Sequence, residues 1–442
     1  MRAKTIVLSL LVILALASSA LVYVSADSKS LSKKQSRKDS GNKSVNAGNF
    51  MPLQQTDTTP MEKVSNVKVD SRLVAADTKF GFNLYSQLTK RAANKNIFIS
   101  PASIAIALAM TYNGATGETR QAMMQALELQ GLTSAEINAA NAQLKTALEN
   151  ADPKVKLEIA NSLWARQGVQ FHSEFVQANK EFYKAEVAEL NFNNPSAVAT
   201  INNWVSKSTH GKIDKIVDQI NSDTLLFLIN AIYFKGSWSE KFDAALTKPE
   251  DFTLADGKQK KHPMMSQSGR YAYFESDKFQ AVALPYGDKR MNMYVFLPKE
   301  NSTLADFHQS LNAQNWGDWM SRFKQMKGDI SLPKFKVEYE TTLKDTLSTL
   351  GMGVAFGGNA DFSAMLKPPA RAFISEVKHK AFAEVNEEGT EAAAVTSVEM
   401  RTTSLGPPPK TFRMNVDHPF FFAIRDNQTG AILFMGSIAE PQ

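Results

Sequence analysis

The chain has 442 residues, of which 43% are hydrophobic and 21% charged, a composition typical of a folded globular protein. Its net charge of +6 is uneven, because residues 1–70 carry ten Lys or Arg and five Asp or Glu, which leaves only +1 for the other 372 residues. A body this close to neutral argues against a nucleic-acid-binding protein. The chain has no Cys, which excludes disulfides, thiol nucleophiles and Cys-ligated metal sites.

The N-terminus has the pattern of an export signal. Arg2 and Lys4 precede an uncharged run over residues 6–24, and residues 24–26 (Val-Ser-Ala) suit a signal peptidase. We therefore predict a signal peptide over residues 1–26 and a secreted or extracytoplasmic protein. The alternative is a retained membrane anchor, because 19 uncharged residues nearly span a bilayer. We expect residues 27–70 to be a disordered basic Ser/Lys-rich linker and residues 71–442 to be one domain.

Helical patterning dominates the first part of this domain and strand patterning the second. Ser100 before Pro101 is typical of a helix N-cap with proline in the first turn, followed by an apolar run. Residues 225–234 and 291–297 are apolar runs of strand length, and residues 335–340 alternate apolar and charged side chains as a half-buried strand does. This order predicts an α+β fold with a large, mainly antiparallel sheet.

Motifs that would support an enzyme are missing from the sequence. It has no G-x-S-x-G, H-E-x-x-H, Walker-loop or G-x-G-x-x-G motif. Its six His include no pair at the i, i+4 spacing that places two imidazoles on one helical face. We therefore expect no metal, no cofactor and no enzymatic activity, with a dispersed Ser–His–Asp triad kept as an alternative.

Residues 376–412 have a pattern that does not fit a simple loop. Apolar and charged residues alternate up to Asn386, which predicts a half-buried strand, and Glu387-Glu388-Gly389 predicts a turn. Uncharged residues then recur at every second position over residues 390–400. Two interpretations remain open. One is an ordinary edge strand, and the other is a loop patterned to become a strand later, for which three consecutive alanines at 392–394 offer little obstruction.

Several segments resemble the serpin family, in family order, from about residue 72 to the end of the chain. They are NIFISPASI at 96–104, NAIYFKGSW at 230–238, EVNEEGTEAAA at 384–394, DHPFFFAIRD at 417–426 and ILFMGSI at 432–438. The resemblance implies a serpin fold. In that fold three β-sheets, with a large, mainly antiparallel central sheet, are surrounded by about eight to nine helices, and a reactive-centre loop is exposed. It also implies a secreted inhibitor of serine proteases that acts as a suicide substrate. The loop is cleaved, the acyl-enzyme is trapped, and the loop inserts into the central sheet.

The resemblance assigns roles to individual residues. The hinge comprises Glu387, Gly389, Thr390, Glu391, Ala392, Ala393 and Ala394, the shutter comprises Ser100, Ser103, Asn230 and His379, and the breach comprises Trp238 and Lys334. Lys334 is expected to pair with Glu387. Val395, where relatives often have a smaller residue, falls on the outward-facing set and is not expected to block insertion.

The reactive bond follows from counting along the loop. If Glu387 is the seventeenth residue from the bond, as the family usually has it, the bond joins Thr403 and Ser404. The alternative joins Arg401 and Thr402. Thr403 suits an elastase-like or subtilisin-like protease, and Arg401 suits a trypsin-like one.

The remaining expectations concern partners. We expect a monomer whose partner is a serine protease, with no nucleic acid, no cofactor, and a membrane only if the signal is retained. The alternative function is that of a non-inhibitory serpin, a carrier or chaperone-like binding protein. A basic cluster at Lys258, Lys260, Lys261 and His262 is interpreted as a solvated turn, and the sequence leaves open whether a polyanionic cofactor such as a polysaccharide acts there.

Overall fold

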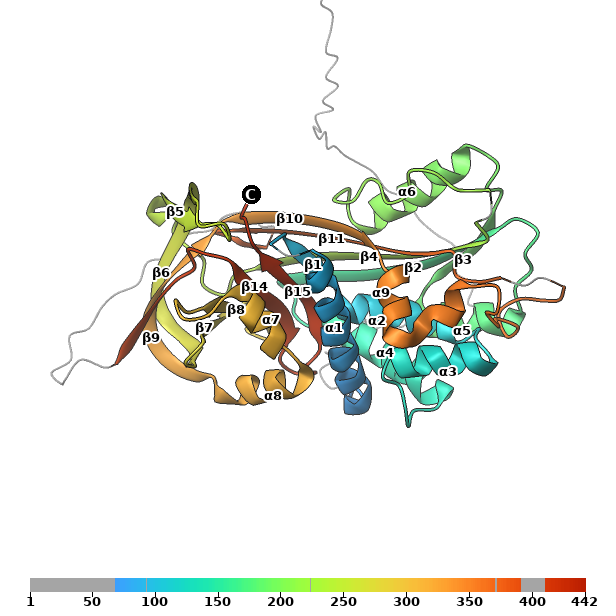
Figure 1. The fold of residues 1–442 in the computed structure, drawn as a ribbon, viewed down its shortest axis with the longest axis horizontal. Coiled ribbons are helices and arrows are strands. Elements are labelled where there is room, and N and C mark those ends of the chain that lie inside the picture. The colour runs from blue at the N-terminus through green and yellow to red at the C-terminus, as the bar shows by residue number, and fades with distance from the viewer. Residues whose placement is uncertain (1–67, 93, 223, 370–371, 391–409) are drawn as a thin grey trace, which may run out of the picture. The chain divides into compact units, whose positions relative to one another are not determined.

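The computed structural model describes residues 68–442 apart from 93, 223, 370–371 and 391–409. The described residues form nine α-helices and fifteen strands (Figure 1). The helices are α1 (Ser71–Arg91), α2 (Pro101–Tyr112), α3 (Gly117–Ala126), α4 (Ser134–Glu149), α5 (Ser173–Tyr183), α6 (Ser196–Ser208), α7 (Leu304–Ser310), α8 (Ala313–Arg322) and α9 (Lys344–Leu347). The strands are β1 (Ile97–Ile99), β2 (Val155–Arg166), β3 (Glu186–Leu190), β4 (Leu226–Ser237), β5 (Lys248–Thr253), β6 (Gln259–Glu275), β7 (Phe279–Pro285), β8 (Met291–Pro298), β9 (Lys324–Pro333), β10 (Phe335–Thr342), β11 (Glu376–Asn386), β12 (Gly389–Thr390), β13 (Thr411–Asn415), β14 (Phe420–Asp426) and β15 (Ile432–Ile438). The expected α+β class is confirmed.

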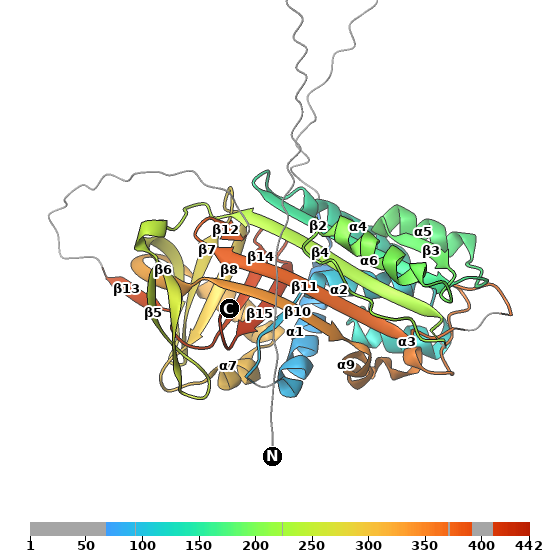
Figure 2. The same cartoon turned by 90° about the horizontal axis from the view of Figure 1, so that it is seen from above.

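One sheet has six strands in the order β10-β11-β12-β4-β2-β3. Its long strands β10, β11, β4 and β2 run side by side (Figure 2). The β10–β11 and β4–β2 pairs are antiparallel, whereas β2–β3 and β11–β4 are parallel. The sheet is therefore mixed. The parallel pairing of β11 with β4 adjoins the short strand β12, which also pairs with both of these strands.

The other sheet has nine strands in the order β1-β15-β14-β8-β7-β6-β9-β13, with β5 paired to β6 off this path. Hydrogen bonding thus joins the described strands into two sheets, where three were expected. The reason is β6, whose 17 residues pair with β5 near their start, with β9 along their middle and with β7 at their end. The single strand β6 therefore joins β5, β9 and β7 into one hydrogen-bonded sheet.

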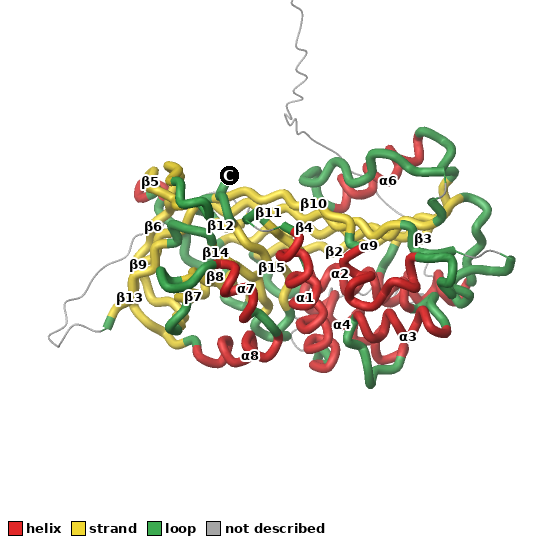
Figure 3. The backbone as a smooth tube through the Cα atoms, in the orientation of Figure 1, coloured by secondary structure: helices red, strands yellow, loops and turns green. Residues whose placement is uncertain are grey.

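Helices cover both faces of the six-stranded sheet, with α6 on one face and α1 to α5 on the other (Figure 3). Ser100 caps α2 as expected, because its side chain accepts a hydrogen bond from the Ser103 backbone nitrogen at 3.4 Å, and every residue of α2 is buried. On the opposite face, Ile201 and Val205 of α6 pack with Ile229 of β4 in a second apolar core. Among the described residues, no helix combines the length and the apolar character needed to cross a membrane.

Candidate functional site at the fork between β4 and β11

Strands β4 and β11 form a fork. They pair directly over five positions, from Glu376 opposite Phe227 to Lys380 opposite Ala231. Beyond these positions the two strands separate, and β12 lies between them, antiparallel to both. The six-stranded sheet is therefore closed at one end of the fork and already holds two residues of the predicted hinge at the other.

A tight turn leads from β11 into β12. The Asn386 side chain accepts a hydrogen bond from the Glu388 backbone nitrogen at 3.0 Å, as the turn predicted at these residues requires. Gly389 follows with φ +143°, and a Cβ atom there would lie 2.2 Å from the Gly236 carbonyl oxygen. Glycine is needed at this position because both its backbone angle and its approach to β4 exclude a side chain.

Thr390 is the first side chain of the hinge to enter the sheet, and it is 1% exposed. Its backbone lies opposite Val385 on one side and Gly236 on the other, and its hydroxyl lies 2.8 Å from the hydroxyl of Tyr286. Desolvation raises the pKa of Tyr286, so this phenol stays protonated. Gly389 and Thr390 therefore already lie in the sheet, where a glycine-sized gap and a buried hydroxyl partner hold them.

Trp238 supports the turn from below. Its ring stacks on that of Tyr286 at 4.4 Å between centroids and 12° between planes. Its indole nitrogen donates to the Asn386 carbonyl oxygen at 2.9 Å, and its backbone nitrogen donates to the Glu388 carbonyl oxygen, also at 2.9 Å. One aromatic residue thus fixes both the turn and the tyrosine that holds Thr390.

Two ion pairs flank the turn. Lys334 Nζ lies 2.9 Å from Glu387 Oε2, and Thr247 donates a hydrogen bond to Glu387 Oε1 at 2.8 Å. Burial alone would raise the pKa of Glu387, but the hydrogen bonds from Lys334 and Thr247 outweigh it and lower this pKa. Lys241 pairs with the neighbouring Glu388. The expected partners Lys334 and Glu387 thus lie together.

The four residues expected to form the shutter meet at the closed end of the fork. His379 lies opposite Asn230 in the β11–β4 register, with His379 Nδ1 and Asn230 Oδ1 3.1 Å apart. The Ser100 backbone nitrogen donates to His379 Nε2 at 3.2 Å, so the ring proton belongs on Nδ1. Asn230 Nδ2 donates to Ser103 and, at 2.7 Å, to Asn161 Oδ1. This network ties α2 to both strands where they meet.

The histidine in this network is neutral. His379 is fully buried, and desolvation lowers its pKa to about 3. A neutral imidazole both accepts from Ser100 and donates to Asn230, whereas a protonated ring would lose its acceptor. The closed end of the fork therefore depends on an uncharged His379.

Sequence reasoning did not identify three of these partners. Tyr286 follows β7 and lies 104 residues before Thr390, and nothing in its sequence context indicates the contact. Asn161 on β2 and Thr247 are likewise ordinary polar residues in their local sequences. The other predicted hinge residues, Glu391, Ala392, Ala393 and Ala394, lie outside the described residues, as do both candidate reactive bonds, Thr403–Ser404 and Arg401–Thr402.

Comparison with known proteins identifies this architecture. Residues 75–441 match the family model described as serpin (serine protease inhibitor). The leukocyte elastase inhibitor of Bos taurus is 36% identical over 382 residues, covering 84% of this chain and 100% of that protein. The solved structure of the thermophilic serpin tengpin in its native state has a TM-score of 0.78 at 34% identity, covering 85% of this chain and 96% of the other. Human thyroxine-binding globulin complexed with its hormone has a TM-score of 0.77 at 29% identity, covering 84% and 99%. The chain therefore belongs to the serpin family, a family of serine protease inhibitors and not of enzymes, which also includes carriers such as thyroxine-binding globulin.

Proposed function

We propose that this serpin inhibits a serine protease by acting as its suicide substrate. The observation that carries the proposal is β12, in which Gly389 and Thr390 lie between β4 and β11 and are antiparallel to both. The fork is thus a strand-shaped gap whose mouth is already occupied by the residues that precede the loop. Residues 391–400 follow directly in the sequence and alternate in the manner of a strand with one buried face.

Extending the register of β12 supports the proposal. Ala392 would lie opposite Phe234, which is buried, so a small apolar side chain is what that face accepts. Glu391, on the other face, would lie between Glu384 and Lys235, which are both partly exposed. The alternation in the sequence therefore matches the two faces of the gap.

The catalytic groups are those of the protease. The inhibitor provides the peptide bond that is cleaved and the sheet into which the cleaved loop inserts. The serine oxygen of the protease attacks the carbonyl carbon of the residue before the reactive bond. The C–N bond breaks, the proton of the serine hydroxyl passes to the leaving amine, and an acyl ester joins the two proteins. Insertion of the freed loop into the fork carries the protease away before water completes hydrolysis.

The same register bears on which bond is cleaved. Met400 would lie opposite Leu226, the first residue of β4, so the sheet would accommodate the loop up to this residue. Cleavage after Thr403 leaves three residues beyond the end of the sheet to reach the acyl ester, whereas cleavage after Arg401 leaves one. This supports the bond between Thr403 and Ser404, and with it a protease that accepts small side chains.

We further propose that the protein acts outside the cytoplasm as a monomer, after removal of residues 1–26. The support is the export pattern of the N-terminus. N-terminal sequencing of the protein recovered from its native host would test this, because a chain beginning at Asp27 is expected. A chain that still begins at Met1 in the membrane fraction would instead favour the retained anchor.

The inhibitory proposal is tested by mixing the protein with elastase, subtilisin and trypsin in turn. A band near the summed masses that resists denaturation is expected with the first two. Mass spectrometry of the released C-terminal fragment should show Ser404 as its first residue. If all three proteases yield only cleaved protein, or no reaction, the chain is not an inhibitor of this kind.

The alternative, a non-inhibitory carrier, would need a site for its ligand. A cavity beside Trp238, lined also by Phe242, Tyr271 and Tyr294, has a volume of about 260 Å³. Pockets that enclose small-molecule ligands usually measure about 300 to 1,000 Å³, so this cavity by itself gives that alternative no specific support.

A further inference from the structure

A charged cleft lies where the chain re-enters the described body at Lys410, just before β13. The cleft measures about 900 Å³, and its lining includes the stacked rings of Tyr273 and Phe412, whose centroids are 3.9 Å apart. Its charged lining residues are Lys299, Arg322, Lys324, Lys410, Arg413, Glu275 and Asp277. Five cations thus face two carboxylates.

Most of this positive charge is not neutralised within the described part of the chain. Lys299 pairs with Glu275 at 2.5 Å. Lys324, Lys410 and Arg413 are exposed, and none of the three has a side-chain ion pair among the described residues. The three therefore offer their charge to solvent or to a partner.

The neighbouring carboxylates compensate only part of this charge: Glu275, which pairs with Lys299, also interacts electrostatically with Lys410. Asp329, which lies opposite Arg413 in the β9–β13 register, accepts a hydrogen bond from Ser268 Oγ at 2.6 Å and forms no ion pair with Arg413. Asp277 also forms no ion pair with the described residues. The carboxylates nearest the cleft leave its net charge positive.

The basic cluster noted in the sequence behaves differently. Its three lysines are all paired: Lys258 with Asp256 at 2.6 Å, Lys260 with Glu440 at 2.8 Å and Lys261 with Asp251 at 2.9 Å. A run of basic residues in the sequence is thus neutral in the structure. The cations of the cleft come from three separate segments, at Lys299, at residues 322–324 and at residues 410–413, and most of them are not paired in this way.

The position of the cleft limits what can dock on it. Six peptide units join Ser404 to Lys410, and at no more than about 3.6 Å each they span at most roughly 20 Å. A protein domain is about 30 Å across, so a protease seated on the bond between Thr403 and Ser404 comes within reach of the cleft. The surface next to the protease's active site is therefore the part of the protease that the cations can meet.

We propose that this cleft is an accessory binding site for an acidic surface of the target protease. The inference rests on the proposed inhibitory function. It extends that function because it predicts the surface charge of the target protease, which the reactive bond does not indicate. Opposite charges attract over about 8 Å to 10 Å at physiological salt, and such attraction raises association rates more than it changes affinity. A protease with an acidic rim around its active site would therefore be inhibited faster than one with a basic rim.

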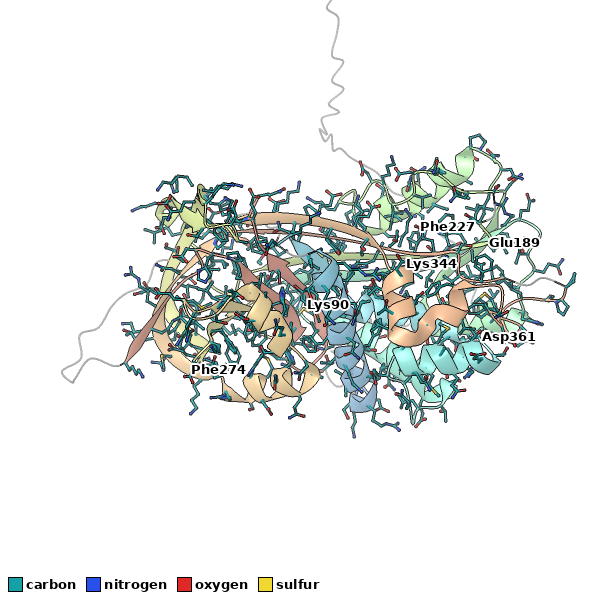
Figure 4. The ribbon with its side chains drawn as sticks, in the orientation of Figure 1. Lys90, Glu189, Phe227, Phe274, Lys344 and Asp361 are labelled. Atoms are coloured by element: carbon teal, nitrogen blue, oxygen red, sulfur yellow. The ribbon has the colours of Figure 1, made fainter. Side chains whose placement is uncertain are left out.

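The test compares two variants with the same change in net charge. The cleft variant carries Lys324→Glu, Lys410→Glu and Arg413→Glu. The control variant carries Lys90→Glu, Lys180→Glu and Lys207→Glu, at exposed positions on α1, α5 and α6. Figure 4 shows Phe274, which lines the cleft, well apart from Lys90. Matching thermal melts would show that both variants fold.

The measured quantity is the second-order rate constant of inhibition for the protease that forms the covalent complex. The protease is used both unmodified and with its surface lysines succinylated, which makes its surface acidic. The cleft variant should inhibit the succinylated protease about tenfold more slowly than the wild type at 50 mM salt, and less than twofold more slowly at 0.5 M. The control variant should stay within about threefold of the wild type.

The outcomes separate this inference from the proposed function. Equal rate constants for the cleft and control variants would overturn the inference while leaving inhibition intact. A difference that appears only when heparin is added would assign the cleft to a sulfated polysaccharide and also overturn it. If no protease forms a covalent complex, the affinity for a catalytically inactive, succinylated subtilisin still tests the cleft, because binding to the uncleaved loop needs no trapping.

Discussion

The hydroxyl groups of Thr390 and Tyr286 lie 2.8 Å apart beneath the mouth of the fork between β4 and β11. Tyr286 is fully buried and stacked on Trp238, so the hydroxyl group that contacts Thr390 is held in a fixed position. Under the proposed mechanism, the first step of strand insertion is therefore complete in the uncleaved protein. The residues after Thr390 would lengthen an existing strand, first beside the separated parts of β4 and β11 and then in place of their direct pairing.

Replacing Thr390 should change the outcome of the reaction and not its recognition. Thr390→Arg would place a charge in the buried interior, which costs several kcal/mol, roughly 3 to 5, unless the charge finds a partner. Residue 390 would leave the sheet, and insertion would be delayed, while a bond thirteen residues away stays accessible. We expect cleavage at the same bond and at a similar rate, with the protease released active.

Thr390→Ser is the matched control, because it keeps the hydroxyl that faces Tyr286. The serine variant should consume close to one inhibitor molecule for each protease molecule trapped. The Thr390→Arg variant should consume many inhibitor molecules for each protease molecule trapped. An arginine variant that traps protease with unchanged stoichiometry would show that this segment does not insert. Loss of cleavage would show that the residue acts in binding instead.

Cleavage of the loop should stabilise the protein. Ten further residues, 391–400, would gain some ten to twenty hydrogen bonds at about 1 kcal/mol net each, against about 1 kcal/mol per residue of ordering entropy. The five pairs between β4 and β11 that must open offset about five of these bonds, so the free energy of unfolding should rise by up to about 5 kcal/mol, and the melting temperature with it. Calorimetry of intact and nicked protein compares the two directly, and superimposable melting curves would contradict insertion.

The ion pair between Lys334 and Glu387 should contribute little on its own. The Lys334 side chain is 39% exposed, so solvent screens the pair, and a coupling free energy of at most about 1 kcal/mol is expected. A double-mutant cycle with Lys334→Ala and Glu387→Gln measures it by urea denaturation. Because the pKa of Glu387 is lowered in the folded state, its contribution should be present above the unfolded pKa and lost as the pH falls through the folded one. A coupling that persists unchanged in 1 M salt would show that packing, not charge, joins the two residues.

His379 should make the closed end of the fork sensitive to acid. Its pKa falls from about 6.5 when unfolded to about 3 when folded, so the unfolded state binds the proton more readily over that range. Its stabilising contribution is complete above pH 6.5 and declines by about 1.4 kcal/mol per pH unit as the pH falls toward 3.

An NMR titration tests this prediction with an internal control. The ring signals of His379 should stay unchanged from pH 8 to pH 5. Those of His418 should titrate above pH 6.5, because the bond to Asp417 outweighs its burial and raises its pKa. Titration of His379 near pH 6 would mean that the fork opens at that pH.

Much of the architecture follows from local patterns in the sequence. The helix that Ser100 caps and the strand that ends at Asn386 appear where the sequence predicts them, because capping and alternation act over a few residues. The position of Thr390 does not follow from the sequence. It depends on Tyr286 and on the space beside Gly236, both of which are remote in sequence. Gly236 is brought near by the six-stranded sheet, and Tyr286 follows β7 of the nine-stranded sheet.

The outward face of the gap could not be inferred from the sequence either. Val395 falls on the outward-facing set and is not expected to block insertion. If the register of β12 were extended, this position would lie opposite Ala231, which is buried in the core shared with α6. The local sequence does not indicate that a helix covers this face.

If the chain is an inhibitor of the proposed kind, the five parallel pairs between β4 and β11 also determine how long it stays active. Under the proposed mechanism these pairs, together with the contact between His379 and Asn230, must break before a longer strand can enter. The working lifetime of the protein is then a rate set by this barrier, and an equilibrium measure of stability does not report it. A substitution that strengthens the inserted sheet more than the fork would raise the melting point of the final state while shortening the shelf life of the active one. Engineering for durability should therefore target contacts present only while β4 and β11 remain paired.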